Sequence, residues 1–71
     1  MTVLIANFEG KRYVVLKNDP ALWSHRAEAT RASWARFYPR VTFTLETDQP
    51  DLAGYSEFYD EVHCKLRPLD E

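Results

Sequence analysis

Cysteine and histidine, the residue types most typical of nucleophilic and metal chemistry, occur once and twice in this 71-residue chain. His63 and Cys64 are adjacent, and neighbouring side chains in an extended strand point to opposite faces, so they are not predicted to act as a nucleophile and its base. His25 is predicted on the solvent side of a helix, and neither histidine has the spacing of a zinc site. The sequence therefore predicts a protein that is not an enzyme, with no catalytic residue, no metal site and no cofactor.

Six acidic residues between positions 46 and 61 form the second group that could do chemistry. An acid–base pair needs one carboxyl group desolvated and another ionised, and nothing here predicts a pocket that excludes water. The ligand pattern of an EF-hand loop is also missing. Two interpretations stay open: a solvated acidic loop, or a surface that presents negative charge to a basic groove on another macromolecule. These residues are Glu46, Asp48, Asp51, Glu57, Asp60 and Glu61.

Aromatic side chains are interleaved with these acids at Tyr55, Phe58 and Tyr59. Tyrosine is a common anchor at protein interfaces, because it offers a large contact area at low entropic cost. The alternative is that Phe58 and one tyrosine complete the core of a small protein. We take Tyr55 and Tyr59 as candidate anchors.

The charges are segregated along the chain, although the net charge is only −2 and the isoelectric point about 5.6. Residues 11–40 carry seven Lys and Arg against two acids, whereas residues 46–61 carry six acids and no cation. A dedicated nucleic-acid-binding domain usually has an isoelectric point above about 9. The arginines at 26, 31, 36 and 40 are spaced by five, five and four residues, which spreads them around a helix. A solvated helix surface is therefore favoured over direct nucleic-acid binding.

The elements that must position these residues begin with a β-hairpin, residues 3–8 and 13–16, around a turn with a glycine. A helix is predicted over residues 20–38, with Asp19 as its cap and Pro39 just after its end. Apolar residues at steps of four, three, four and three define its buried side. The predicted buried residues are Trp23, Ala27, Thr30, Trp34 and Phe37, and the predicted solvent-facing ones include His25, Glu28, Arg31, Ala32, Ala35 and Arg36.

Two further strands are predicted from alternating apolar residues, over 41–46 and 62–67. In the strand predicted over 62–67, Cys64 is expected to point inward together with Val62 and Leu66. An intermolecular disulfide through Cys64 stays an alternative if that strand lies at a sheet edge. The connection over 47–60 is longer than a usual hairpin loop, and a short helix over 51–59 is an alternative within it.

These elements predict one α+β domain over residues 1–71: a ββαββ two-layer sandwich, with one amphipathic helix on an antiparallel sheet of three to four strands. The first hairpin is apolar on both faces, and one helix cannot cover both. Two alternatives follow for the second face. Either it is an apolar surface patch to which a partner or a second copy binds, or the long loop folds back over it. One face would carry Val3, Ile5, Val14 and Leu16, and the other Leu4, Ala6, Phe8, Tyr13 and Val15.

The lone cysteine, the lack of a signal segment and the lack of an apolar run of about 18 residues predict a cytoplasmic protein without a membrane span. In its size, its single α+β domain, its lack of a catalytic signature and its acidic, aromatic stretch from Glu46 to Glu61, the sequence resembles the small phage-encoded inhibitors of bacterial defence, of the anti-CRISPR or anti-restriction type. The resemblance implies a stoichiometric inhibitor, inside a bacterial host, that occupies a nucleic-acid or subunit-docking surface on a nuclease complex. That class shares no motif, so it assigns no role to any residue.

The function predicted from these observations is a non-enzymatic, protein-binding inhibitor of a nucleic-acid-targeting complex, such as a CRISPR effector or a restriction complex. Its predicted partner-binding residues are Glu46, Asp48, Asp51, Tyr55, Glu57, Tyr59, Asp60 and Glu61. One alternative is a nucleic-acid-binding regulator that uses Lys11, Arg12, Arg31, Arg36 and Arg40. Another is a homo-oligomeric accessory protein, whose predicted dimer face is Leu4, Phe8, Tyr13 and Val15.

Overall fold

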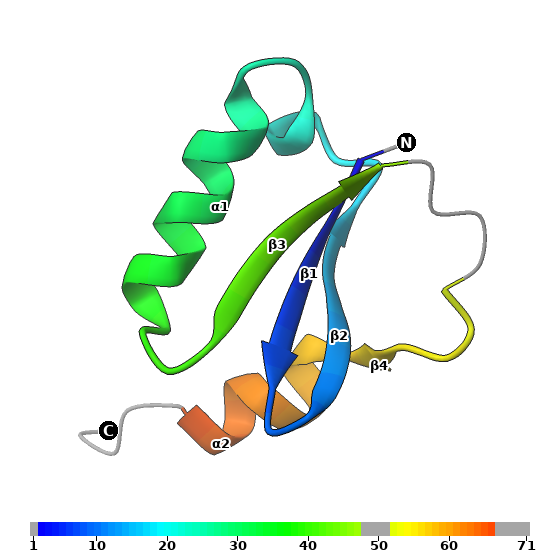
Figure 1. Cartoon of the computed structure of the whole chain (residues 1–71), viewed down its shortest axis with the longest axis vertical. Helices are drawn as coiled ribbons and strands as arrows, with labels where there is room; N and C mark the ends of the chain where they lie inside the picture. Colours follow the sequence, from blue (N-terminus) through cyan, green and yellow to red (C-terminus); the bar gives the residue numbers. More distant parts are fainter. Residues whose placement is uncertain (1, 48–51, 67–71) are drawn as a thin grey trace.

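The computed structural model describes residues 2–47 and 52–66. It has the predicted α+β class: a four-stranded, mostly antiparallel sheet with one main helix packed on it (Figure 1). The strand order is β3-β1-β2-β4, so the first strand lies inside the sheet, antiparallel to both of its neighbours. The last strand has two residues and runs parallel to β2. The strands are β1 (Thr2–Phe8), β2 (Lys11–Lys17), β3 (Thr42–Thr47) and β4 (Ser56–Glu57).

The predicted hairpin is confirmed, and its turn is Glu9-Gly10, both with positive φ (53° and 79°). Two positive-φ residues are typical of the type I′ turn, whose twist matches that of the flanking strands. The register shifts between Leu4 and Ile5, which leaves Val15 as an extra residue on β2. This bulge places Leu16 opposite Leu4. The predicted grouping of Leu16 with Val3 and Ile5 is therefore wrong.

The main helix is shorter than predicted, because α1 spans Arg26–Phe37. Pro20–Leu22 forms a separate 3₁₀ turn, η1, and Asp19 caps it by accepting a hydrogen bond from the Ala21 backbone N–H at 2.9 Å. Ser24, with φ of 52°, separates the two helical pieces, since a left-handed residue cannot continue a right-handed helix. Trp23 therefore lies outside the helix and is 60% exposed, against the prediction that it is buried.

The side of α1 that faces the sheet carries Thr30 and Trp34 and continues to Tyr38, which follows the helix end. Tyr38 stacks on Trp34 with ring centroids 5.9 Å apart and takes the place on the core that was predicted for Phe37. Phe37 is instead 78% exposed. Ala35, predicted to face solvent, packs against the core.

The predicted strand over 62–67 is wrong where the structure describes it. The segment is helical, with a π-helical turn η2 (Tyr59–His63) that runs directly into the short helix α2 (Cys64–Leu66); together they form the C-terminal helical segment. Val62 in this segment and Phe58, the residue directly before it, are buried, and their four-residue spacing suits a helix. Cys64 is consequently exposed, not inward, and its thiol donates to the Tyr59 carbonyl at 3.4 Å. The alternative helix over 51–59 is also wrong, since β4 occupies part of that range.

The main core lies between the sheet and the helical elements that pack on it. One face of the hairpin packs under α1, η1 and the C-terminal helical segment. No helix within the described residues is long and apolar enough to cross a membrane. The buried residues of this core are Leu4, Ala6, Phe8, Tyr13, Leu22, Val41, Phe43, Phe58 and Val62.

Candidate functional site

Some carboxylates of the predicted acidic surface form ion pairs with cations of the same chain. Glu46, on β3, pairs with Arg12 on β2, and only 21% of its side chain is exposed. The Arg12 guanidinium carbon also lies 5.1 Å from the centroid of the Tyr55 ring. These three side chains form one group, so Glu46 and Tyr55 are already engaged within the fold.

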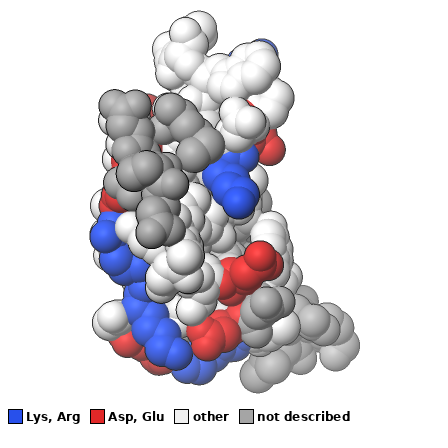
Figure 2. Space-filling model, turned by 90° about the vertical axis from the view of Figure 1, so that its right-hand side faces the viewer, with Lys and Arg blue, Asp and Glu red and all other residues white. Residues whose placement is uncertain are grey.

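The other described acids of residues 46–61 differ in whether they form an ion pair. Glu61 pairs with Lys11 at 3.5 Å, whereas Glu57 is exposed and has no ion pair among residues 2–47 and 52–66. Tyr59 is 51% exposed. Asp48, Asp51 and the side chain of Asp60 lie outside the described part of the structure. Figure 2 shows that positive and negative side chains are interspersed over the face with β2 and β4, so this face does not present one uniform sign of charge.

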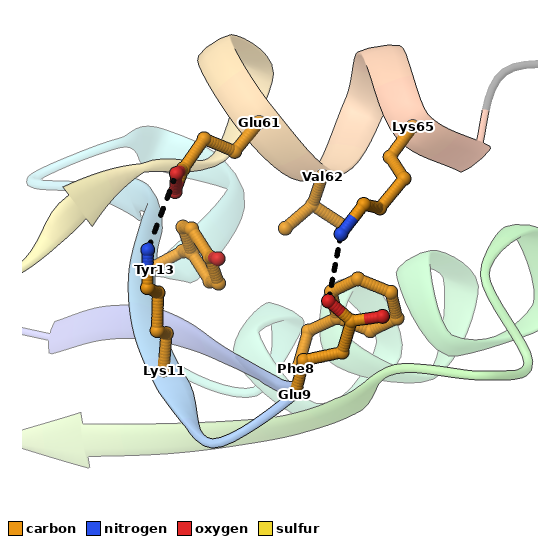
Figure 3. Close-up of a pocket in the computed structure, with 7 residues that line it drawn as sticks. All are labelled: Phe8, Glu9, Lys11, Tyr13, Glu61, Val62 and Lys65. Atoms are coloured by element: carbon orange, nitrogen blue, oxygen red, sulfur yellow. Dashed lines mark hydrogen bonds and ion pairs between the residues drawn. The ribbon is translucent and has the colours of Figure 1, made fainter.

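A pocket of about 220 Å³ lies between the hairpin turn and the C-terminal helical segment (Figure 3). Two ion pairs frame it: the Lys11 pair with Glu61, and Lys65 with Glu9 at 2.7 Å. Lys65 also lies 5.6 Å from the Phe8 ring centroid. Every charge at this pocket therefore has an opposite charge beside it, which ties the turn to the end of the described chain.

The electrostatics of this pocket do not predict a catalytic group. Burial raises the pKa of Tyr13 above its usual value of 10.0, and a hydrogen bond to Glu61 raises it further. The hydrogen bond to Glu9 raises the pKa of Lys65 above 10.5. Catalytic lysines and tyrosines act as bases when their pKa falls toward neutrality, and both shifts here go the other way. The two ion pairs link the hairpin turn to the C-terminal helical segment.

Sequence reasoning missed one polar contact, between the Tyr38 hydroxyl and Nδ1 of His63 at 2.6 Å. Burial raises the pKa of Tyr38 above 10.0. The pair lies within a cluster of aromatic rings that includes Trp34, Phe58 and Tyr59. The contact was not predicted because His63 was assigned to a strand, whereas it lies in the π-helical turn η2. No group of three or more His, Cys, Asp or Glu able to hold a metal occurs in the described ranges.

The predicted dimer face is not a surface. Leu4, Phe8 and Tyr13 are buried in the core, and Val15 is half-buried against it. The reason is that α1 and the C-terminal helical segment cover the side of the hairpin that these residues occupy. A dimer contact through them would require the core to open, so this assignment is wrong.

The side of α1 that points away from the sheet carries a different set of residues. Arg26, Ala29, Ser33 and Arg36 recur at steps of three or four, and Phe37 lies four residues after Ser33. This spacing places them on one side of the helix, and all five are exposed. We call this surface the outer face of α1. Ser33, Arg36 and Phe37 line a depression on it.

The arginines of this region fall into two groups. Arg31 pairs with Glu28 at 2.6 Å and lies away from the outer face. Arg26, Arg36 and Arg40, which follows the helix, are exposed and have no ion pair within the described ranges. Of the five cations predicted for nucleic-acid binding, Lys11, Arg12 and Arg31 are thus paired internally. Of these five predicted cations, Arg36 and Arg40 are the two without an ion pair among the described residues, so they remain free to contact a nucleic acid.

No protein-family model, curated protein or solved structure matches this chain in the three comparisons made. The functional argument therefore rests on the geometry and charges described above.

Proposed function

We propose that the chain is a non-enzymatic binding protein that acts by occupying the surface of a macromolecular partner, with the outer face of α1 as its contact surface. The observation that carries the proposal is the exposure of Phe37. At 78%, it is the most exposed of the large apolar side chains in the described structure. It is flanked by an exposed arginine, Arg36, and it lines a depression.

The residue types on this face support a contact role. Aromatic residues and arginine are enriched at interfaces and dominate their binding energy. Arg26 and Arg36 have no internal ion pair among the described residues, so a partner would not have to break one to engage them. The small residues Ala29 and Ser33 between them let a partner approach the helix closely.

A second candidate surface is the corner formed by Glu57 and Tyr59, where an exposed carboxylate lies close in sequence to a half-exposed tyrosine. This corner retains two of the residues predicted for an inhibitor that docks on a basic groove. It is favoured by the exposure of Tyr59, 51%, and by the lack of a described ion pair at Glu57.

The test is affinity capture from a bacterial lysate with three tagged proteins: the wild type, an Arg36→Glu/Phe37→Ala variant of the outer face, and a Glu57→Lys/Tyr59→Ala variant of the corner. We expect the outer-face variant to lose the macromolecule that the wild type recovers, while the corner variant keeps it. Lys17→Glu is the matched charge control, because Lys17 is exposed and without a described ion pair but lies on β2.

Two results would contradict the proposal. Retention of the partner by the outer-face variant together with its loss by the corner variant would transfer the function to Glu57 and Tyr59. Lys17 lines a depression with Glu57 and Tyr59, so equal loss with Lys17→Glu would show that recovery does not depend specifically on the outer face. Circular dichroism of each variant checks that the fold is unchanged.

A further inference from the structure

Resting on the proposed function, we infer that the partner of the outer face of α1 is a single-stranded nucleic acid, whose phosphates contact Arg26 and Arg36 and one of whose bases stacks on Phe37. The helix of 12 residues is about 18 Å long, so these side chains span the length of a few nucleotides. Arg40 follows the helix end and is also exposed.

The sign of the charge on this surface points to a polyanion. The three exposed arginines carry no described ion pair, and no acidic residue belongs to the outer face as defined. The acid of α1, Glu28, accepts three hydrogen bonds of 2.6 to 3.1 Å from the guanidinium group of Arg31. The chain is acidic overall, yet the helix presents a positive side, and a phosphate backbone supplies the complementary charge.

The position of Phe37 points to a single strand and not to a duplex. An exposed phenylalanine ring offers a flat apolar surface, and any unpaired base can stack on it because every base has a π face. Bases in a duplex are stacked on each other and are not available for this contact. The depression that Ser33, Arg36 and Phe37 line places the ring beside a guanidinium group, where a base and its phosphate can be held together.

The test is fluorescence anisotropy of labelled thymidine and adenosine 15-mers, as DNA and as RNA, between about 50 and 200 mM NaCl. For two to three phosphate contacts we expect a log–log slope of affinity on salt of about −1.4 to −2. Arg36→Gln should reduce that slope by about 0.7. Phe37→Ala should weaken binding roughly 5- to 100-fold and leave the slope unchanged, because stacking releases no counterions.

Two matched controls accompany these variants. Trp23→Ala removes another exposed aromatic residue that lies outside α1, and Lys17→Gln removes an unpaired cation from the sheet; both should bind as the wild type does. Phe37 and Arg36 are exposed, so their substitution should not unfold the protein, and a thermal melt verifies this.

Several results would overturn the inference. One is the absence of any anisotropy change with all four oligonucleotides at the lowest salt. Another is equal affinity for a duplex with no effect of Phe37→Ala. A third is binding of polyglutamate as tight as that of the oligonucleotides; if lysate capture still depended on the outer face, the proposed function would stand while the nucleic-acid inference failed.

Discussion

The guanidinium group of Arg12 and the carboxylate of Glu46 meet across strand β1, although 34 residues separate them in the sequence. Arg12 lies opposite Asn7, and Glu46 lies opposite Val3, so the pair crosses the sheet over Ile5. Ile5 and Val3 have no exposed surface. The aliphatic part of Arg12, the ion pair and the Tyr55 ring thus cover the face of the hairpin that lies opposite the helical core.

This relationship predicts that Arg12 stabilises the fold more than an ordinary surface cation does. Arg12→Ala should lower the free energy of unfolding by about 1–2 kcal/mol, from the lost pair and the exposure of Ile5. Arg31→Ala, whose partner Glu28 lies on the helix surface, is the matched control and should cost about 0.5 kcal/mol or less. Urea denaturation measures both. Equal effects would show that the cover over Ile5 contributes nothing.

The C-terminal helical segment should be part of the cooperative fold, because Phe58 is 1% exposed and contacts the rings of Trp34, Tyr38 and Phe43. Phe58→Ala should cost about 3–5 kcal/mol, enough to unfold a domain of this size. Phe37→Ala deletes the same side chain at an exposed site and should change stability by less than about 0.5 kcal/mol. Thermal unfolding followed by circular dichroism compares the two. A small loss for Phe58→Ala would mean that this segment docks weakly.

The elements that the sequence predicted correctly are those with local causes. The turn glycine, Gly10, marked the hairpin, and Pro39 marked the end of the helix. Asp19 marked a cap, although it caps the turn η1 and not the main helix for which it was predicted. Each of these signals acts within a few residues, through φ preference or through a hydrogen bond to a nearby backbone group. The α+β class followed from these signals together with the alternating apolar residues that predicted the strand β3.

The errors arose where distant residues decide the outcome. The alternation of Val62, Cys64 and Leu66 fits a strand, but the burial of Phe58 with Val62 selects a helix. Ser24 carries no sequence signal for a left-handed conformation, so the break before α1 was not foreseeable. The internal ion pairs of Glu46 and Glu61 were not predicted, because their partners lie on the first hairpin and strand order determines that they meet.

Stability should fall in alkaline solution. The pKa of Tyr13 and that of Tyr38 are raised in the folded protein, mainly by burial, so the unfolded chain releases these protons more readily. The contribution is fully present below about pH 10 and is lost as the pH rises through the folded-state values. Lys65, with its raised pKa, acts in the same direction. Urea denaturation between about pH 8 and pH 11 should show a steeper loss for the wild type than for Tyr13→Phe/Tyr38→Phe. Parallel curves would contradict this assignment.

Ser24 offers a stabilising substitution, because its φ of 52° is costly for a residue with a side chain and free of cost for glycine. Ser24→Gly should raise the free energy of unfolding by about 0.5–1 kcal/mol, the relief of strain being partly offset by the greater entropy of the unfolded chain. Ser33→Gly, in the interior of α1, is the matched control and should lower it by a similar amount, since glycine disfavours helical geometry. Chemical denaturation of both variants gives opposite signs if the chain breaks at Ser24. A loss of stability in both would show that the Ser24 side chain is needed where it lies, in the depression shared with Trp23 and Asn18.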